Sequence, residues 1–415
     1  MPASDYDALI VGARVAGSTL AIRLAQRGRR VLMVDRDSFP SDTISTHGLN
    51  FMAVDSLRRL GVLERIEAAG FRRMYRHRAW LGDIMVEAPA GPPGAYTLAP
   101  RRIVLDQVLI DRAVEAGAEF MERSRVDGLL VEDGTIVGAT IQRIGGDAFE
   151  VRSRVVVGAD GKSSKIAEWV GAAKYSEGDP GRPIFYGYFQ GVESLTEPTV
   201  EMFFASNHLG FCMPMRPDEH ILIIEAQPED FARIRTDARA WFLSEYTTFP
   251  GMNTRIRHAT LEGNILGVRG IQNYFRTPYG PGWALSGDAA YVKDPITAYG
   301  VGDAMLQGFW LARSLDEFFG GKPWQEAMSA YQERRDNAFR AFFEQTAHAV
   351  SLRDDEGALA ELRSVLVNQH DTRVLLQMMP RFLDQAFDPM ARFRHAIMRS
   401  AWDTAQEQSS TPAAT

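Results

Sequence analysis

Glycine turns that directly follow short apolar runs are the features of this chain best suited to binding a phosphorylated ligand. The first run, Ala8 to Val11, is followed by Gly12, Ala16 and Gly17 in the segment LIVGARVAGSTLAIRL. Gly12 allows a sharp turn out of a strand, and Gly17 allows the next helix to pack closely against that strand. The N-terminus of the helix would present unpaired N–H groups and a partial positive charge to a pyrophosphate.

An acidic residue stands where such a unit would hold a ribose. Asp35 ends the next apolar run, Val31 to Val34, and Arg36 follows it. A carboxylate at the end of a second strand can accept hydrogen bonds from an adenosine ribose. Arg14 occupies the middle glycine position of the dinucleotide motif, so we expect its guanidinium to point outward or to contact a phosphate itself. An ordinary βαβ unit that binds no ligand is the alternative for this stretch.

A second glycine turn follows the apolar run Val155 to Val157. Its turn residues are Asp160 and Gly161, and Ser163 or Ser164 could cap the helix that comes next. Because this turn lies more than a hundred residues after the first, we expect the chain to rejoin the same sheet after an excursion.

Gly287 and Asp288 form a third turn of this kind. A loop with Pro295 then leads to Gly300 and to a long helix that opens with Asp303. A carboxylate at a strand end, beside a glycine turn into a helix N-terminus, can hold a hydroxylated and phosphorylated ligand. The alternative is a plain turn at Gly287 with Asp303 as the helix N-cap.

A polar loop, Asp37 to Asn50, leaves the second strand on the same edge of the sheet as the first turn. Ser45, Thr46 and His47 are therefore candidates for lining a cofactor or a substrate. A solvated turn that caps the next helix is the equally simple alternative.

The patterning of the remaining chain predicts the elements that must position these turns. Aromatic residues are dense in four strand-like segments, which suits a sheet with one face toward a core or a pocket. Asp133-Gly134 predicts a hairpin turn. The predicted strands are 128–131, 135–142, 149–157, 184–192, 199–204, 210–214 and 220–226, and the predicted helices run from Met52 to Leu63, from 103 to 117, from Pro228 to Tyr246, and over 324–350, 356–367, 372–388 and 389–406.

Composition limits the class of protein. The chain has 415 residues, 45% of them hydrophobic, which is enough for two or three domains with cores. Its net charge of −7 gives no electrostatic reason to expect a nucleic-acid partner. The single cysteine, Cys212, excludes an internal disulfide framework, and the lack of a Cys/His cluster predicts no metal site. With no apolar run of membrane-spanning length and no basic leader, we expect a cytoplasmic protein without stable membrane insertion.

Taken together, the segments GARVAG, GADGKSS and SGDAAYVKDP resemble the FAD-dependent monooxygenases of the single-component aromatic-hydroxylase type. That group shares its fold with flavin halogenases and geranylgeranyl-type reductases, and the resemblance covers about residues 5–320. It implies an α/β fold: a Rossmann-like FAD-binding domain with an inserted antiparallel β-sheet substrate domain and a helical C-terminal region. The implied FAD-binding parts are 1–75, 101–180 and 276–320, the substrate parts are 76–100 and 181–275, the helical region is 321–406, and 407–415 is a disordered tail.

The resemblance also implies roles for individual residues of the first two motifs. Gly12, Ala16 and Gly17 would contact the FAD pyrophosphate, whereas Asp35 and Arg36 would contact the adenosine. Asp160 and Gly161 fall on the motif that serves FAD and nicotinamide binding. Arg14 and Lys165 depart from the glycine and the arginine usual at their positions.

Further roles come from the third motif and from two outlying positions. Gly287 and Asp288 would reach the ribityl chain and phosphate, and Pro295 and Gly300 would border the isoalloxazine. Arg102 begins an R-x-x-L-D pattern that often carries an FAD-contacting arginine, with a surface arginine as its alternative. His47 stands where several members place an arginine against the pyrophosphate. Tyr291 and Ala298 depart from the usual histidine and glycine.

The activity implied is hydroxylation or epoxidation of a hydrophobic, aromatic or polycyclic small molecule, with FAD as cofactor and NAD(P)H and O₂ as cosubstrates. No catalytic acid or base can be assigned without distances to the reacting atoms. Three alternatives stay open: a flavin-dependent reductase of an isolated double bond, a flavin halogenase, and a flavin-free binding protein that kept the fold. The W-x-W-x-I-P signature of tryptophan halogenases is absent from the sequence.

Overall fold

The computed structural model describes residues 5–82, 84–205, 208–295 and 298–352. The chain divides into one unit that ends at Gln332 and a second that begins at Glu333. The predicted helices 356–367, 372–388 and 389–406, like the predicted tail, lie outside the described residues. The elements below belong to the first unit, apart from the later part of α10 (Trp324–Leu352).

The first sheet brings the three glycine turns to one edge. Its strand order is β16-β17-β8-β1-β2-β5, with β7 and β6 continuing from β8. Val11 of β1 and Leu285 of β17 both pair in parallel with Gly158 of β8, so these three strands end in register. The bounds are β1 Tyr6–Val11, β2 Val31–Val34, β5 Glu119–Met121, β6 Ser124–Glu132, β7 Thr135–Arg143, β8 Ala148–Gly158, β16 Tyr279–Gly280 and β17 Trp283–Leu285.

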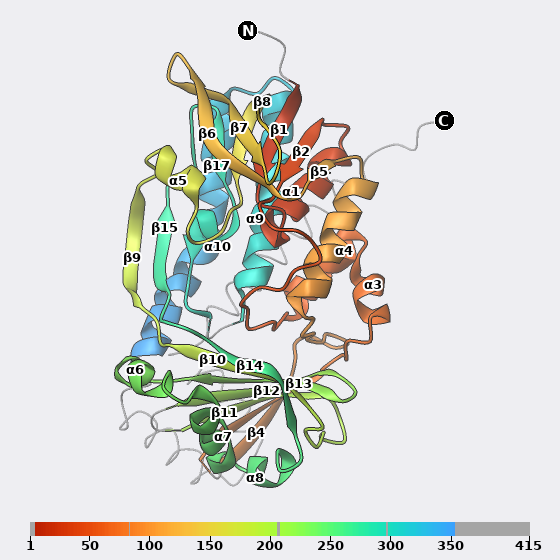
Figure 1. The fold of residues 1–415 in the computed structure, drawn as a ribbon, viewed down its shortest axis with the longest axis vertical. Coiled ribbons are helices and arrows are strands. Elements are labelled where there is room, and N and C mark those ends of the chain that lie inside the picture. The colour runs from red at the N-terminus through yellow and green to blue at the C-terminus, as the bar shows by residue number, and fades with distance from the viewer. Residues whose placement is uncertain (1–4, 83, 206–207, 296–297, 353–415) are drawn as a thin grey trace. The chain divides into compact units, whose positions relative to one another are not determined.

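The second sheet is the predicted, largely antiparallel insertion. Its order is β14-β10-β13-β12-β11-β3-β4, and Figure 1 shows α7 and α8 on its side away from the first sheet. One pair, β11 with β3, is parallel, and its two strands come from separate excursions of the chain. The bounds are β3 Arg76–Leu81, β4 Ile84–Pro89, β10 Ile184–Gln190, β11 Thr199–Phe204, β12 Leu209–Arg216, β13 Glu219–Glu225 and β14 Thr260–Val268.

A third, small sheet was not predicted from the sequence. It has the order β18-β15-β9, and both of its strand pairs are antiparallel. The bounds are β9 Lys174–Pro180, β15 Gln272–Arg276 and β18 Tyr291–Val292.

The helices differ from the prediction at two breaks. Gly61 adopts a left-handed conformation with φ 72° and ends α2, so the helix predicted from Met52 to Leu63 is two helices. The helix predicted over Pro228–Tyr246 is likewise interrupted between α6 and α7. The bounds are α1 Val15–Ala25, α2 Phe51–Leu60, α3 Leu63–Ala68, α4 Arg102–Glu115, α5 Lys165–Trp169, α6 Phe231–Ile234, α7 Ala238–Thr248, α8 Met252–Arg255 and α9 Gly300–Phe319.

Both large sheets bury side chains on two faces, which explains their nearly continuous apolar runs. In β10, Tyr186 and Tyr188 join the core that also contains α1 and α9, whereas Phe185 and Phe189 join the core under α7. The two faces of this strand therefore serve different parts of the molecule, and the tyrosine face is turned toward the first sheet.

Candidate cofactor site

The three glycine turns meet with no room for side chains between them. A Cβ atom on Gly12 would lie 2.4 Å from the carbonyl oxygen of Ala159, which belongs to the second turn. A Cβ on Gly287 would lie 2.7 Å from the Cβ of Ala16. Both glycines also have positive φ angles, 102° and 64°, which side chains disfavour. Loops that lie far apart in the sequence thus form one cradle.

Two helix N-termini at this cradle have no capping side chain on their backbone N–H groups. The N-cap of α1 is Arg14 and that of α9 is Tyr299, and neither side chain caps its helix. Gly17 allows α1 to start close to the turn, since a Cβ there would lie 1.8 Å from the Gly12 carbonyl oxygen. The α9 helix begins at the exposed Gly300, three residues earlier than Asp303. N–H groups left without a capping side chain attract phosphate.

Asp35 supports the first turn from below. One carboxylate oxygen accepts a 2.8 Å hydrogen bond from the Ala13 N–H, and the other accepts from the Asp37 N–H at 2.9 Å. Burial raises the pKa of Asp35, and these two backbone bonds oppose that effect. Its predicted contact with an adenosine ribose stays a prediction, whereas its support of the turn is direct.

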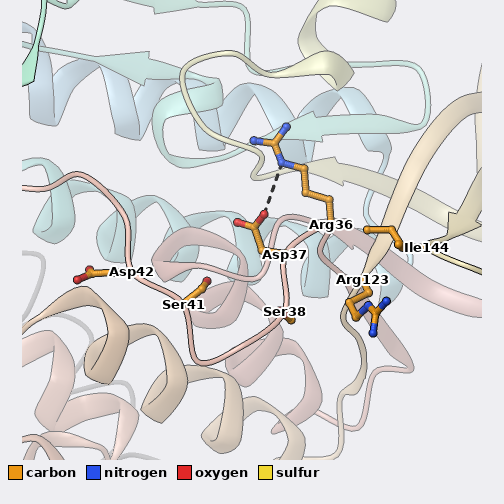
Figure 2. A pocket seen from close by; sticks show the side chains of 7 residues that line it. All are labelled: Arg36, Asp37, Ser38, Ser41, Asp42, Arg123 and Ile144. Atoms are coloured by element: carbon orange, nitrogen blue, oxygen red, sulfur yellow. Dashed lines mark ion pairs between the residues drawn. The ribbon is translucent and has the colours of Figure 1, made fainter. Parts of the chain in front are cut away.

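A cavity of about 450 Å³ lies at the end of β2, where adenosine was expected (Figure 2). Arg36, whose side chain is 77% exposed, borders it and lies 3.9 Å from Asp37. Arg123 and Ile144 form part of the wall and were missed, because their turns approach β2 only in the folded sheet. Two aspartates, Asp37 and Asp42, and two serines complete the wall, so it offers both hydrogen-bond donors and acceptors to the adenosine end of a cofactor.

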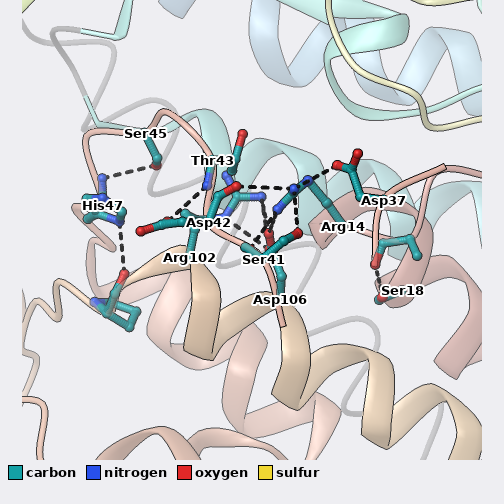
Figure 3. A network of polar contacts seen from close by, with 12 residues as sticks. Arg14, Ser18, Asp37, Ser41, Asp42, Thr43, Ser45, His47, Arg102 and Asp106 are labelled. Carbon is teal, nitrogen blue, oxygen red and sulfur yellow. Dashed lines mark hydrogen bonds and ion pairs between the residues drawn. The ribbon is translucent and has the colours of Figure 1, made fainter. Parts of the chain in front are cut away.

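Arg14 does not cross the cradle. Its guanidinium donates to Asp106 of α4 at 2.6 Å and to Asp37 and the Ser41 hydroxyl at 3.1 Å each (Figure 3). The first of the two predicted orientations, outward from the turn, is therefore the one present. Arg102 donates to the same Asp106 carboxylate through two 3.0 Å bonds, so the predicted FAD-contacting arginine is also tied into this network.

His47 requires a correction. Its Nδ1 lies 3.1 Å from the Pro100 carbonyl oxygen, which can only accept, so Nδ1 carries the proton. Its Nε2 must then accept from the hydroxyl of Tyr188, 2.6 Å away. Burial, with the nearby charge of Arg102, lowers the pKa of His47 to about 3. The neutral ring therefore has no N–H left to donate, and it does not offer the pyrophosphate contact that the resemblance implied.

Two neighbouring loops at this site contain a non-glycine residue with a left-handed backbone conformation. His47 has φ 58° and Ala298 has φ 54°, a conformation that few non-glycine residues adopt. The two lie close together, since a Cβ on Gly48 would be 3.0 Å from that of Ala298. The Thr46 carbonyl accepts from the Gly48 N–H at 2.7 Å. Strained backbone of this kind gathers at functional sites.

Asp160 combines a structural role with an unused acceptor. One of its oxygens accepts from the N–H groups of Lys165 and Ile166, at 2.8 and 3.3 Å, and so stabilises the start of α5. The other oxygen is buried and has no partner among the described residues. Gly161 follows with φ 80°. A buried acceptor left open fits a ligand that brings a hydroxyl or N–H donor.

Asp288 keeps surface that is exposed to solvent, but many protein atoms lie around its carboxyl group. The resulting desolvation raises the pKa of this carboxyl, and the charges of Arg102 and Lys162 oppose that rise. Its backbone carbonyl accepts a 2.8 Å hydrogen bond from the Tyr274 hydroxyl, which fixes the turn. The Pro295 carbonyl accepts from the Ala298 N–H at 2.9 Å; residues 296–297 between them are outside the described residues.

These features fit a dinucleotide cofactor of the FAD type: a glycine cradle, two helix N-termini without side-chain caps, an open carboxylate and a cavity at the adenosine end. Within the described ranges, no group of three or more His, Cys, Asp or Glu side chains could hold a metal ion. None of the helices described is both long enough and apolar enough to cross a bilayer.

Comparison with known proteins agrees with this class of site. A family model described as "FAD binding domain" matches residues 5–346, and the chain belongs to that family. The 1H-pyrrole-2-carbonyl-[peptidyl-carrier protein] brominase of Pseudoalteromonas luteoviolacea is 27% identical over 338 residues, which is 79% of this chain and 82% of the brominase. The digeranylgeranylglycerophospholipid reductase of Methanothrix thermoacetophila is 25% identical, over 79% of this chain and 82% of the reductase.

Solved structures share the fold at lower identity. The flavin-dependent brominase Bmp2 superposes with a TM-score of 0.74 at 24% identity, covering 96% of this chain and 99% of the brominase. The Pseudomonas aeruginosa protein PqsL in complex with 2-aminobenzoylacetate gives a TM-score of 0.72 at 19% identity, over 84% and 97% of the two chains. The predicted resemblance to the FAD-dependent monooxygenase, halogenase and reductase superfamily is confirmed, and so is the fold class.

Proposed function

We propose that this protein is an FAD-dependent monooxygenase that uses NAD(P)H and O₂ to hydroxylate or epoxidise a hydrophobic, aromatic or polycyclic small molecule. The 2.6 Å hydrogen bond between His47 and Tyr188 carries the proposal. It joins the loop after β2, on the cofactor side, to a strand of the second sheet. An aromatic sheet face therefore stands directly against the segments that would hold the flavin.

That face can form the wall for an organic substrate. It is apolar and buried, and it includes Tyr186, Tyr188, Met213, Met215, Ile221 and Ile223. The Tyr186 hydroxyl lies beside the Ser45 backbone and the Tyr188 hydroxyl, so it adds a polar group to this otherwise apolar face. The Arg101 guanidinium lies 4.0 Å from the centre of the Tyr188 ring and adds a positive charge beside it.

The chain's own residues would bind, orient and shield the reaction. FAD, when bound, supplies electron transfer and oxygen activation. The uncapped ends of α1 and α9 would hold its phosphates, Asp288 the ribityl hydroxyls, and Asp35, Arg36 and Arg123 the adenosine end. The buried sheet face would exclude water and strengthen every charge interaction near the substrate.

Halogenation is the second candidate, because the P. luteoviolacea brominase aligns with most of this chain's length. Double-bond reduction is the third, since the M. thermoacetophila reductase aligns over a similar share. The three reactions differ in what they consume. Oxygen transfer and halogenation both need O₂, halogenation also needs halide, and reduction of a double bond needs neither.

The test is oxygen uptake by the FAD-loaded protein with NADH or NADPH across a panel of aromatic and polyketide compounds, with and without bromide. We expect substrate-stimulated uptake and products heavier by one oxygen atom. An Asp288→Ala variant serves as a control, because weaker FAD binding should lower the turnover. Products that contain bromine would establish the halogenase instead, and equal turnover without O₂ would establish the reductase.

A further inference from the structure

Arg14 stands where dinucleotide motifs carry their middle glycine, and its contacts give that substitution a purpose. All of the hydrogen bonds of its side chain run to α4 and to the loop that follows β2, including bonds to the Ser41 and Asp42 carbonyl oxygens at 3.4 Å each (Figure 3). The guanidinium also lies 5.3 Å from the centre of the Phe39 ring. The side chain is thus held on several sides, away from the N–H groups that open α1.

The carboxylate of Asp106 is the central group of this network. It has no exposed surface, and it contacts two guanidinium groups: Arg14 at 2.6 Å and Arg102 at 2.9 Å. A buried carboxylate is tolerated only when cations or hydrogen bonds compensate it. Asp37, the other carboxylate that Arg14 contacts, is 43% exposed and therefore solvated, whereas Asp106 is fully buried. Arg14 alone can therefore neutralise Asp106 when Arg102 turns away.

Arg102 is the cation placed to turn toward a cofactor. It starts α4 two residues after Pro100, whose carbonyl oxygen lies 3.1 Å from the His47 Nδ1. Arg102 therefore lies where the start of α4 meets the 37–50 loop, and its positive charge adds to burial in lowering the pKa of His47. Arg14, by contrast, is fixed by five hydrogen bonds to α4 and the 37–42 loop.

We propose that Arg14 is a positioning residue for the cofactor: it neutralises Asp106, so that the guanidinium of Arg102 can turn to a phosphate of the bound dinucleotide. Without Arg14, binding would require Arg102 to leave a buried carboxylate without a cation. The proposal rests on the FAD site described above. It reverses the simplest view of the substitution, in which an arginine in place of glycine obstructs the cofactor.

The two views predict opposite signs for one measurement, the dissociation constant for FAD followed by quenching of flavin fluorescence. We expect Arg14→Ala to raise this constant by about tenfold or more, the change that follows from the loss of one hydrogen-bonded charge contact. Asp106→Asn should leave it within about threefold of wild type, because the neutral amide no longer holds Arg102.

The double variant Arg14→Ala/Asp106→Asn separates charge compensation from simple loss of a side chain. We expect it to bind FAD within about threefold of Asp106→Asn alone, since the buried charge that needed Arg14 is gone. It also removes the uncompensated buried carboxylate, so we expect it to be more stable than Arg14→Ala alone. Circular dichroism establishes the folded state of every variant before titration.

Arg29→Ala is the matched control. Arg29 lies 2.6 Å from Asp316, so it joins the connection between α1 and β2 to α9, and its loss should leave FAD affinity unchanged. Tighter or unchanged binding by Arg14→Ala would overturn the proposal and leave the FAD site standing. So would a double variant that binds FAD tenfold more weakly than Asp106→Asn. A wild-type protein that takes up no FAD would overturn both the site and the role of Arg14.

Discussion

The first glycine turn and the junction between His47 and Tyr188 both border the candidate site, but they are made differently. The turn is made of backbone, and a single added Cβ at Gly12 would clash with the Ala159 carbonyl oxygen. The junction is made of side chains, joined by one hydrogen bond between a loop and a sheet. The shape of the turn is therefore fixed by its backbone, whereas a side chain of the junction can be replaced without disrupting the turn.

This difference accounts for a fold that serves several reactions. The chain aligns over most of its length with a brominase and with a reductase, two proteins that are named for different reactions. A cradle fixed by backbone keeps the cofactor constant, and a wall of side chains can be altered residue by residue. Substrate choice should therefore lie in the second sheet and the 45–48 loop.

The largest effect should come from adding a methyl group to the turn. Gly12→Ala places a Cβ 2.4 Å from a backbone oxygen at φ 102°, so we expect about 3 kcal/mol or more of lost unfolding free energy and no FAD binding. Gly28→Ala is the control, since that glycine has φ 74° with nothing within 4 Å and should lose only about 1–2 kcal/mol. Urea titration with FAD titration checks both. Equal losses in the two variants would show that the turn is not tightly packed.

The turn was also the part that the sequence predicted well. A strand, a glycine turn and a helix give local signals, and three such signals at the ends of apolar runs predicted the convergence near Gly12, Asp160 and Asp288. The strands of the second sheet were predictable for the same reason, because their alternation and aromatic content are local. The third sheet was missed, since its strand β9 has the sequence KYSEGDP, with little apolar alternation.

The junction was not predictable, because its partners meet only in the folded chain. His47 and Tyr188 are 141 residues apart, and Arg14 and Asp106 are 92 apart. The sequence singled out His47 as a residue that could line a cofactor or a substrate, or donate to a pyrophosphate, but not as a partner of Tyr188. No local pattern says which strand will face a loop, so the choice between cofactor contact and a bond to Tyr188 required the tertiary structure.

Removing one hydroxyl group at the junction should have an intermediate effect. Tyr188→Phe leaves the buried Nε2 of His47 without a donor, which should lower the unfolding free energy by about 1–3 kcal/mol. Because the loop beside Ala298 loosens, FAD affinity should also fall about fivefold, the equivalent of roughly 1 kcal/mol. Thermal melts and FAD titration give the two quantities.

Tyr246→Phe is the matched control on the other side of the same sheet. The Tyr246 hydroxyl accepts from the Ile223 N–H at 2.8 Å in the core under α7, so its loss should destabilise the protein comparably. Its FAD affinity should nevertheless equal that of wild type. If both variants lost FAD affinity alike, the effect would come from general destabilisation and the junction would have no separate role.

The most gradual effect is a pH dependence specific to the junction, because it is spread over several pH units. The pKa of His47 falls to about 3 in the folded protein, chiefly through burial, against about 6.5 in an unfolded chain. The unfolded chain therefore takes up a proton below pH 6.5 that the folded protein refuses, so stability present at neutral pH is lost as the pH falls toward 3. One such group changes the unfolding free energy by at most about 1.4 kcal/mol per pH unit.

Urea titrations between pH 7 and 4 should show the stability of wild type falling more steeply than that of His47→Gln, by about this amount per pH unit. The stability of Tyr246→Phe should run parallel to that of wild type. Parallel curves for wild type and His47→Gln would mean that the His47 ring is protonated in the folded protein, and the direction of its bond with Tyr188 would then be reversed.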